Sequence, residues 1–249
     1  MMQKFLSKVP EITLVFWITK ILTTGMGETF SDYLVTRFDP VISAPITGLV
    51  LIAALVLQFK VRKYIPWIYW FVVVMVSIVG TMFADIIHVV LGVPYIVSTS
   101  FFAILLAVIF IAWYAREKTL SIHSIYTVHR EFFYWATVLA TFALGTAAGD
   151  MTATTLHLGY LSSALMFTAI MLVPIAGFYW FKFGEVFAFW FAYVMTRPLG
   201  ASFSDWMGVS HARGGLEWGT GPVSLVLFIL IVGFVGYLAY THEDVEPAA

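Results

Sequence analysis

One pattern occurs four times in this chain of 249 residues, each time within a long apolar stretch. The pattern is Phe/Tyr-Trp-x9-Gly-x4-Asp, where x is any residue, and its copies span 16–32, 69–85, 134–150 and 189–205. Repetition of this kind indicates a fold built from copies of one structural unit. We therefore predict a fourfold internal repeat, and every other expectation has to fit it.

The segments around the repeat are apolar enough to cross a lipid bilayer. Hydrophobic residues make up 61% of the chain and charged residues only 11%, against about 25% charged residues in a soluble domain. A membrane-spanning helix needs about 20 mostly apolar residues, and eight stretches qualify, near 11–34, 41–59, 66–91, 94–115, 131–156, 158–181, 184–208 and 220–241. The sequence predicts an all-α membrane protein with eight transmembrane helices and no separate soluble domain.

The basic residues of the loops predict the orientation of the chain. Most of them fall before the first span or after each even-numbered span, at Lys4, Lys8, Lys60, Arg62, Lys63, Arg116, Lys118, Arg130 and Lys182. The opposite loops hold only Arg37 and Arg213. Because loops rich in Lys and Arg stay inside, we expect a multi-pass protein of the cell (inner) membrane with both termini in the cytoplasm. The acidic tail at Glu243, Asp244 and Glu246 is expected to face solvent.

Each copy of the pattern begins a pair of spans. The residues 1–249 are read as a single membrane domain of four tandem helical hairpins, approximately 11–60, 66–115, 131–181 and 184–241. All four motif helices then run outward from the cytoplasmic side, so the repeats are parallel. Parallel repeats are related by an axis along the membrane normal, which predicts pseudo-symmetry about that axis.

The Trp and Gly of the pattern have structural interpretations. The tryptophans fall near the expected cytoplasmic boundary, where an aromatic belt is common. Each glycine is followed four residues later by a small residue, in the pairs Gly27/Ser31, Gly80/Ala84, Gly145/Gly149 and Gly200/Ser204. Small residues at this spacing let transmembrane helices approach closely, so we expect the motif helices to pack through these faces.

The aspartates of the pattern are the candidate functional residues. At 1.5 Å per residue each lies roughly 22 Å along the helix from its Trp, inside the expected hydrocarbon layer. A carboxylate there costs about 2.5–3.5 kcal/mol unless it faces protein, water or a counter-ion. We therefore expect the four to meet at one depth in the bundle interior, at Asp32, Asp85, Asp150 and Asp205.

Helical periodicity extends this polar surface inward from the aspartates. One turn before them come Glu28, Thr81, Thr146 and Ala201, and one turn earlier Thr24, Ser77, Phe142 and Arg197. Two cations, Lys20 and Arg197, also lie within the spans. They either neutralise buried carboxylates or contact a transported species, and the sequence leaves both roles open.

A metal site is the most specific expectation from these residues. Oxygen-rich sites without thiols suit hard ions such as Mg²⁺, Ca²⁺ or Mn²⁺, and the chain has no cysteine. We expect Glu28, Asp32 and Asp85 to form the tighter half of the site, with His88, one turn after Asp85, as a further ligand. Asp150 and Asp205 are expected to serve in proton coupling or to pair with Arg197.

These observations predict a secondary transporter of a small cation, with a divalent metal as the first choice, coupled to protons because metal binding displaces them. The alternatives are a proton-coupled transporter of an organic or anionic solute, held by Lys20 and Arg197, a membrane-embedded enzyme, and a structural membrane protein. No nucleotide-binding, protease or hydrolase motif is present, so we expect no enzyme and no nucleic-acid partner. The expected partners are the lipid bilayer and a small ion or solute; a homo-oligomer stays open, and no cofactor is expected beyond a divalent cation bound as substrate.

Three stretches of sequence resemble a known family. They are K-V-P-E-x-T-L-x-F-W-x-x-K at 8–20, G-E-T-x-x-D at 27–32 and the later G-x-x-x-x-D copies. With them the chain resembles a bacterial family of tandem-repeat integral membrane proteins of unknown function, the uncharacterised membrane-anchored proteins. The resemblance covers essentially the whole chain and implies the repeat architecture, without an activity.

Overall fold

A computed structural model describes residues 7–245, which form eight α-helices. The helices are α1 (Leu14–Arg37), α2 (Pro40–Lys60), α3 (Pro66–Asp85), α4 (Tyr95–Glu117), α5 (Val128–Asp150), α6 (Tyr160–Phe181), α7 (Glu185–Gly208) and α8 (Thr220–Thr241). Each of them begins and ends within a few residues of an expected span. Residues 7–245 contain helices and no strand, so the described part of the chain is all-α, as predicted. Lys4 and Glu246, used above for the orientation and the acidic tail, lie outside the described residues.

Local sequence signals explain several helix starts. The side chains of Thr13, Asp39 and Thr127 accept hydrogen bonds from the first turns of α1, α2 and α5. Such caps satisfy backbone N–H groups that have no partner inside the helix. Proline stands at the start of α2 and α3, where its missing N–H costs nothing.

Six helices are long and apolar enough to span a membrane, namely α2, α3, α4, α5, α6 and α8. By helix length and hydropathy the chain is therefore a multi-pass membrane protein. The helices α1 and α7 are not among the six, although each has 24 residues. They carry charged side chains in their middle, including Lys20, Glu28 and Arg197.

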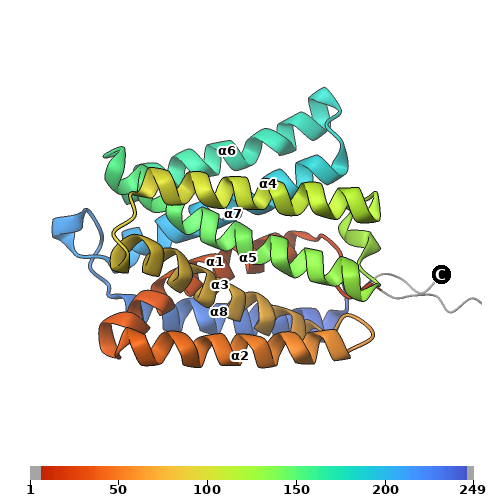
Figure 1. Cartoon of the computed structure of the whole chain (residues 1–249), viewed down its shortest axis with the longest axis horizontal. Helices are drawn as coiled ribbons and strands as arrows, with labels where there is room; N and C mark the ends of the chain where they lie inside the picture. The colour runs from red at the N-terminus through yellow and green to blue at the C-terminus, as the bar shows by residue number, and fades with distance from the viewer. Residues whose placement is uncertain (1–6, 246–249) are drawn as a thin grey trace, which may run out of the picture.

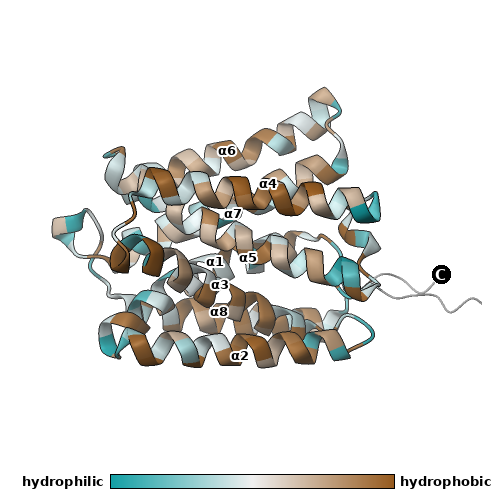
Figure 2. Ribbon diagram, in the orientation of Figure 1, coloured by the Kyte–Doolittle hydropathy of each residue, from teal (hydrophilic) through white to brown (hydrophobic). Residues whose placement is uncertain are grey.

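The four odd-numbered helices form a closed ring, because α1 packs against α3, α3 against α5, α5 against α7, and α7 against α1. All four begin at the right-hand end of the molecule in Figure 1, where the described chain also ends. The even-numbered helices lie outside this ring, and most of their residues are hydrophobic, as the colours of Figure 2 show. Each packs mainly against the odd-numbered helix that follows it, and α8 packs against α1. The two helices of one sequence repeat are thus not each other's main neighbours, so the structure does not show the close pairing within each repeat that four helical hairpins imply.

One glycine contact recurs around the ring. A Cβ placed on the motif glycine of each helix would overlap a side chain of the next helix, in the pairs Gly27 with Ser77, Gly80 with Phe142, Gly145 with Arg197, and Gly200 with Thr24. The partners are the residues two turns before each motif aspartate. The glycines are therefore needed for close approach between neighbouring helices.

The Phe/Tyr-Trp pairs also contact each other in cyclic order. The ring of each Phe or Tyr lies near the Trp of the next helix, in the pairs Phe16–Trp70, Tyr69–Trp135, Tyr134–Trp190 and Phe189–Trp17. Their ring centroids are 5.5–6.1 Å apart. Trp70, Trp135 and Trp190 are at most 5% exposed, so the interpretation of these tryptophans as a lipid-facing belt was wrong. These three tryptophans are buried, and each packs against an aromatic ring of the neighbouring helix.

Candidate functional site

All four motif aspartates line one cavity of about 460 Å³, together with Glu28. We call this the acidic cavity, defined by Glu28, Asp32, Asp85, Asp150 and Asp205. The remaining walls are mostly apolar, with Val35, Ala44, Met82, Ile86, Val89 and Val90. It lies toward the ends of the odd-numbered helices, opposite the Phe/Tyr-Trp pairs. The expectation that the four aspartates face a common space agrees with this geometry.

The aspartates lie on two kinds of local structure. Asp85 and Asp150 are the last residues of α3 and α5, and each is followed by a π-helical turn, Ile86–Val90 and Met151–Thr155. Asp32 and Asp205 lie within α1 and α7, which continue as α-helix. Such π turns are rare and occur often at functional sites.

The four aspartate side chains have no partner among residues 7–245: no hydrogen bond or ion pair reaches their carboxylate oxygens. Asp205 is only 6% exposed, and the other three are half-buried. An unpartnered, deeply buried carboxylate is costly, because it has lost water without gaining another donor. The acidic cavity therefore favours a species that brings positive charge or protons.

Directly below the cavity, Arg197 and Glu28 form a buried ion pair, with Nη2 of the arginine 2.6 Å from Oε2 of the glutamate. Nη2 also donates to the hydroxyls of Thr146 and Thr81, and Nη1 donates to the carbonyl oxygen of Thr24 at 2.8 Å. We call Arg197, Glu28, Thr81 and Thr146 the arginine layer. One guanidinium thus contacts the three other helices of the ring.

The arginine layer explains the differences among the four repeats. The residues one turn before the aspartates are Glu28, Thr81 and Thr146 in the first three copies, and all three accept from Arg197. In the fourth copy this position is Ala201. The fourth copy instead contributes the positive charge of Arg197, one helical turn before Ala201. The sequence placed these residues on one polar surface, and the structure brings them into one hydrogen-bonded layer.

Lys20 lies deeper and has no acidic partner in the described chain. Its Nζ is buried without a hydrogen bond. The ammonium lies 4.1 Å from the ring centroid of Phe142 and 4.3 Å from that of Tyr193. Neutralisation of a buried carboxylate, one of its two expected roles, does not occur here, whereas Arg197 does neutralise Glu28.

The carboxylates that come closest differ from the expected trio. Oxygens of Glu28, Asp150 and Asp205 all lie within 4.8 Å of one another. The expected trio of Glu28, Asp32 and Asp85 does not form such a group in the described residues. The reason is tertiary: helix neighbours and the orientation of each side chain cannot be read from the repeat spacing.

His88 does not join the carboxylates. It lies in the π-helical turn after Asp85, where Nδ1 is 2.6 Å from the carbonyl oxygen of Val93. Its ring stacks on that of Tyr95, with centroids 3.1 Å apart. The expected face shared with Asp85 assumed a regular α-helix, and the wider π turn changes the direction of the side chain.

Two ionisable side chains that line the acidic cavity were not predicted as site residues. Tyr95, at the start of α4, and Arg213, in the loop before α8, both line it. Arg213 donates to the hydroxyl oxygen of Tyr160 at 2.5 Å. Burial lowers the pKa of its guanidinium, but this phenol and then the carboxylates of Asp205 and Asp32 raise it, and the net shift is upward. No sequence signal distinguished these positions, because both lie outside the repeated pattern.

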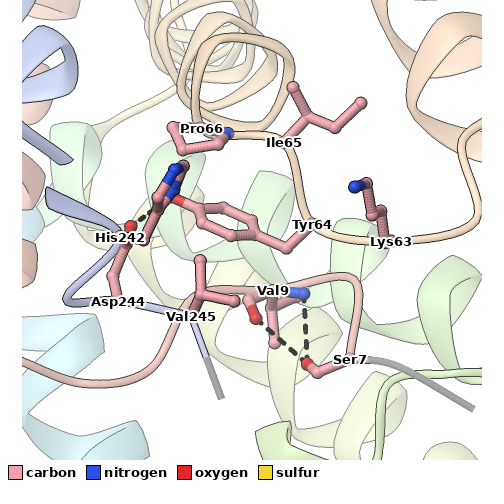
Figure 3. Close-up of a pocket in the computed structure, with 9 residues that line it drawn as sticks. All are labelled: Ser7, Val9, Lys63, Tyr64, Ile65, Pro66, His242, Asp244 and Val245. Carbon is pink, nitrogen blue, oxygen red and sulfur yellow. Dashed lines mark hydrogen bonds between the residues drawn. The ribbon is translucent and has the colours of Figure 1, made fainter. Parts of the chain in front are cut away.

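At the opposite end of the ring, one buried acid has hydrogen-bond partners for both of its carboxylate oxygens. Glu131, fully buried at the start of α5, accepts from Lys8 Nζ at 2.5 Å and from Gln58 Nε2 at 3.1 Å. Nearby, a second cavity of about 400 Å³ lies beside the segment before α1, the α2–α3 loop and the segment after α8 (Figure 3). Its residues include Tyr64, whose hydroxyl donates to Asp244 at 2.5 Å. Burial raises the pKa of both groups. Asp244 is only 1% exposed, so the expectation that it faces solvent was wrong.

Comparison with known proteins assigns the repeat but no activity. Residues 15–64, 68–119, 133–183 and 188–244 each match the sequence model of one family, described as Repeat of Unknown Function (DUF347). These four segments contain the four copies of the pattern and most of the described helices. No curated protein and no solved structure matches the chain.

Proposed function

Because the chain belongs to the Repeat of Unknown Function (DUF347) family, we propose its function from the site itself: a secondary transporter of a small cation, coupled to protons. The observation that carries the proposal is a set of four buried or half-buried carboxylates without a partner in the described chain, facing one cavity. The first-choice substrate is a divalent metal ion. Glu28, Asp150 and Asp205 supply its charge-bearing oxygens, and Asp32 and Asp85 supply the other side of the cavity.

The topology belongs to the same proposal. All eight helices cross the membrane, with the two polar helices α1 and α7 shielded by the other six. Both termini lie in the cytoplasm, and the four repeats surround a pseudo-symmetry axis along the membrane normal. The cyclic glycine and aromatic contacts support this arrangement, and the Lys and Arg distribution supports its orientation.

Charge balance favours a cation over an anion. Five carboxylates line the acidic cavity, against Arg213 at its wall and Arg197 just below. Ionised carboxylates this close repel one another unless protons or a cation neutralise them. Metal entry therefore displaces protons, which is the physical basis of the proton coupling. An anionic solute is less favoured, because Arg197 is already occupied by Glu28.

A metal-panel stability screen tests the proposal. Purified protein in detergent is heated with MgCl₂, CaCl₂ or MnCl₂ between about pH 5.5 and 8.5. A ligand at 100 times its Kd adds about 2.7 kcal/mol to the free energy of unfolding, so at least one metal should raise the melting temperature, and more strongly at high pH. The proposal fails if no cation stabilises the wild type at any pH in this range.

The matched variants locate the site. Asp150→Asn and Asp205→Asn should remove the metal-dependent stabilisation, because they delete ligands without changing shape. Asp39→Asn is the control: it makes the same chemical change in an exposed residue that caps α2, and Asn caps helices as well as Asp. Equal loss in the control would show a general charge effect and no site.

A further inference from the structure

Glu28 belongs both to the acidic cavity and to the arginine layer, and this double role has a consequence for the cavity. Its Oε2 accepts from Arg197, Thr81 and Thr146. Its other oxygen, Oε1, accepts no hydrogen bond within residues 7–245. A cation held by Glu28, Asp150 and Asp205 would therefore compete with Arg197 for the charge of Glu28.

The guanidinium of Arg197 also closes the interior of the ring. Its side chain crosses α5 at Gly145, where a Cβ would overlap Cβ and Cγ of the arginine. It is fully buried and contacts α1, α3 and α5. Its Nε has no hydrogen-bond acceptor in the described chain, so Arg197 is held by hydrogen bonds from its two terminal nitrogens.

A cation moving inward from the cavity would meet two positive groups in succession. The first is Arg197 and the second is Lys20, both near the ring of Phe142. Beyond them the aromatic pairs fill the ring between its helices. In this structure the carboxylates of the acidic cavity attract cations, but Arg197, Lys20 and the aromatic pairs block a path from the cavity through the ring.

We propose that Arg197 is a displaceable gate: a cation or proton that takes the charge of Glu28 releases the guanidinium and unblocks the ring below the acidic cavity. The proposal rests on the proposed function and adds its regulation. Until it is displaced, Arg197 competes with a cation for the carboxylate of Glu28. Its removal should therefore both strengthen cation binding and open the interior.

The lack of cysteine in the chain allows a direct test of the opening. A single Ser77→Cys substitution places a thiol on α3, two turns before Asp85, at a fully buried position. A small cationic thiol reagent is added to the purified protein. In the otherwise wild-type chain modification should be slow, and in Arg197→Met it should be at least tenfold faster. Arg197→Lys, which keeps the charge and loses the grip on several acceptors, should be intermediate.

Two further measurements keep the test informative. Arg197→Met alone leaves Glu28 buried and unpaired, and this variant can fail to fold; Arg197→Met with Glu28→Gln removes both charges and should fold and react as fast. Independently, Arg197→Met should bind Mn²⁺ at least tenfold more tightly than wild type.

The outcomes separate the two proposals. Equal thiol reactivity with and without Arg197, in folded protein, overturns the gate. An unchanged or weaker Mn²⁺ affinity overturns the competition. If the wild type and all variants bind no cation, the proposed function fails, while the reactivity of Ser77→Cys still decides whether Arg197 closes the ring.

Discussion

The two ends of the helix ring each contain a deeply buried acid on a motif-bearing helix, and only one of these two acids has a hydrogen-bond partner. At the end where the chain starts, Glu131 is fully buried but meets Lys8 and Gln58. At the other end, Asp205 is almost as buried and meets no partner in the described chain. A buried charge whose partners all belong to the protein is neutralised within the fold. A buried carboxylate without a partner has to be neutralised by a proton or a cation. The first end is held together by an internal ion pair, whereas the binding role that we propose concerns the second end.

The largest expected effect breaks the partnered end. Glu131→Ala leaves the ammonium of Lys8 buried without its carboxylate, and loss of one member of a buried pair costs about 3–5 kcal/mol. The free energy of unfolding, measured in detergent with increasing SDS, should fall by that order. Lys8→Met combined with Glu131→Gln should recover most of the loss, because no unpaired charge remains and the introduced amide oxygen still accepts from Gln58. If the single variant is as stable as wild type, the pair is not structural.

The next effect concerns the arginine layer, which separates the two ends. A Cβ at Gly145 would overlap the stem of Arg197, whereas a Cβ at Gly149 would meet its nearest neighbour, Ser202, at an ordinary 3.5 Å. Gly145→Ala should therefore destabilise by about 1–3 kcal/mol through overpacking, and Gly149→Ala should be neutral or stabilising, since alanine is the better helix former. Thermal melts of the two variants make a matched comparison. Equal effects would contradict the close contact.

A smaller effect of opposite sign is expected at the unpartnered end. Asp205→Asn replaces a deeply buried carboxylate that lacks a donor by a neutral amide of similar shape. The melting temperature at pH 8 without added metal should rise or stay the same, with a gain of at most about 1 kcal/mol, whereas Glu131→Gln should lower it. A clear loss of stability in Asp205→Asn would mean that this carboxylate has a structural partner, and would remove the contrast between the ends.

The smallest effect is a pH dependence at Asp244, outside the membrane spans. Burial raises its pKa above the ordinary value, so the protonated form is favoured in the folded state. The contribution of protonated Asp244 to the free energy of unfolding is fully present below the unfolded pKa of about 3.9. This contribution is lost as the pH rises through the pKa of the folded state. Between about pH 4 and 8, Asp244→Asn should therefore lose less stability than wild type. Parallel stability curves for the two proteins would contradict this.

The sequence by itself determined the class of the protein and its repeating unit. Fixed spacing of Trp, Gly and Asp in apolar segments indicated the four repeats, the positions of the helices, and the aspartates at equivalent places. These features follow from helical geometry and from the cost of polar groups in apolar segments. They depend on residues close together in the chain, so spacing alone is enough.

Only the tertiary structure decided which side chains meet. The pairing of Arg197 with Glu28, the nearness of Glu28 to Asp150 and Asp205, and the burial of Trp70 all join different helices. The packing of α2, α4 and α6 against the following repeat, and of α8 against α1, is of the same kind. The spacing of a repeat fixes positions along each helix, but the neighbours of a helix depend on how the whole ring packs. That is why the sequence could place the carboxylates near a common depth and could not say which three lie within 4.8 Å or that one arginine already holds one of them.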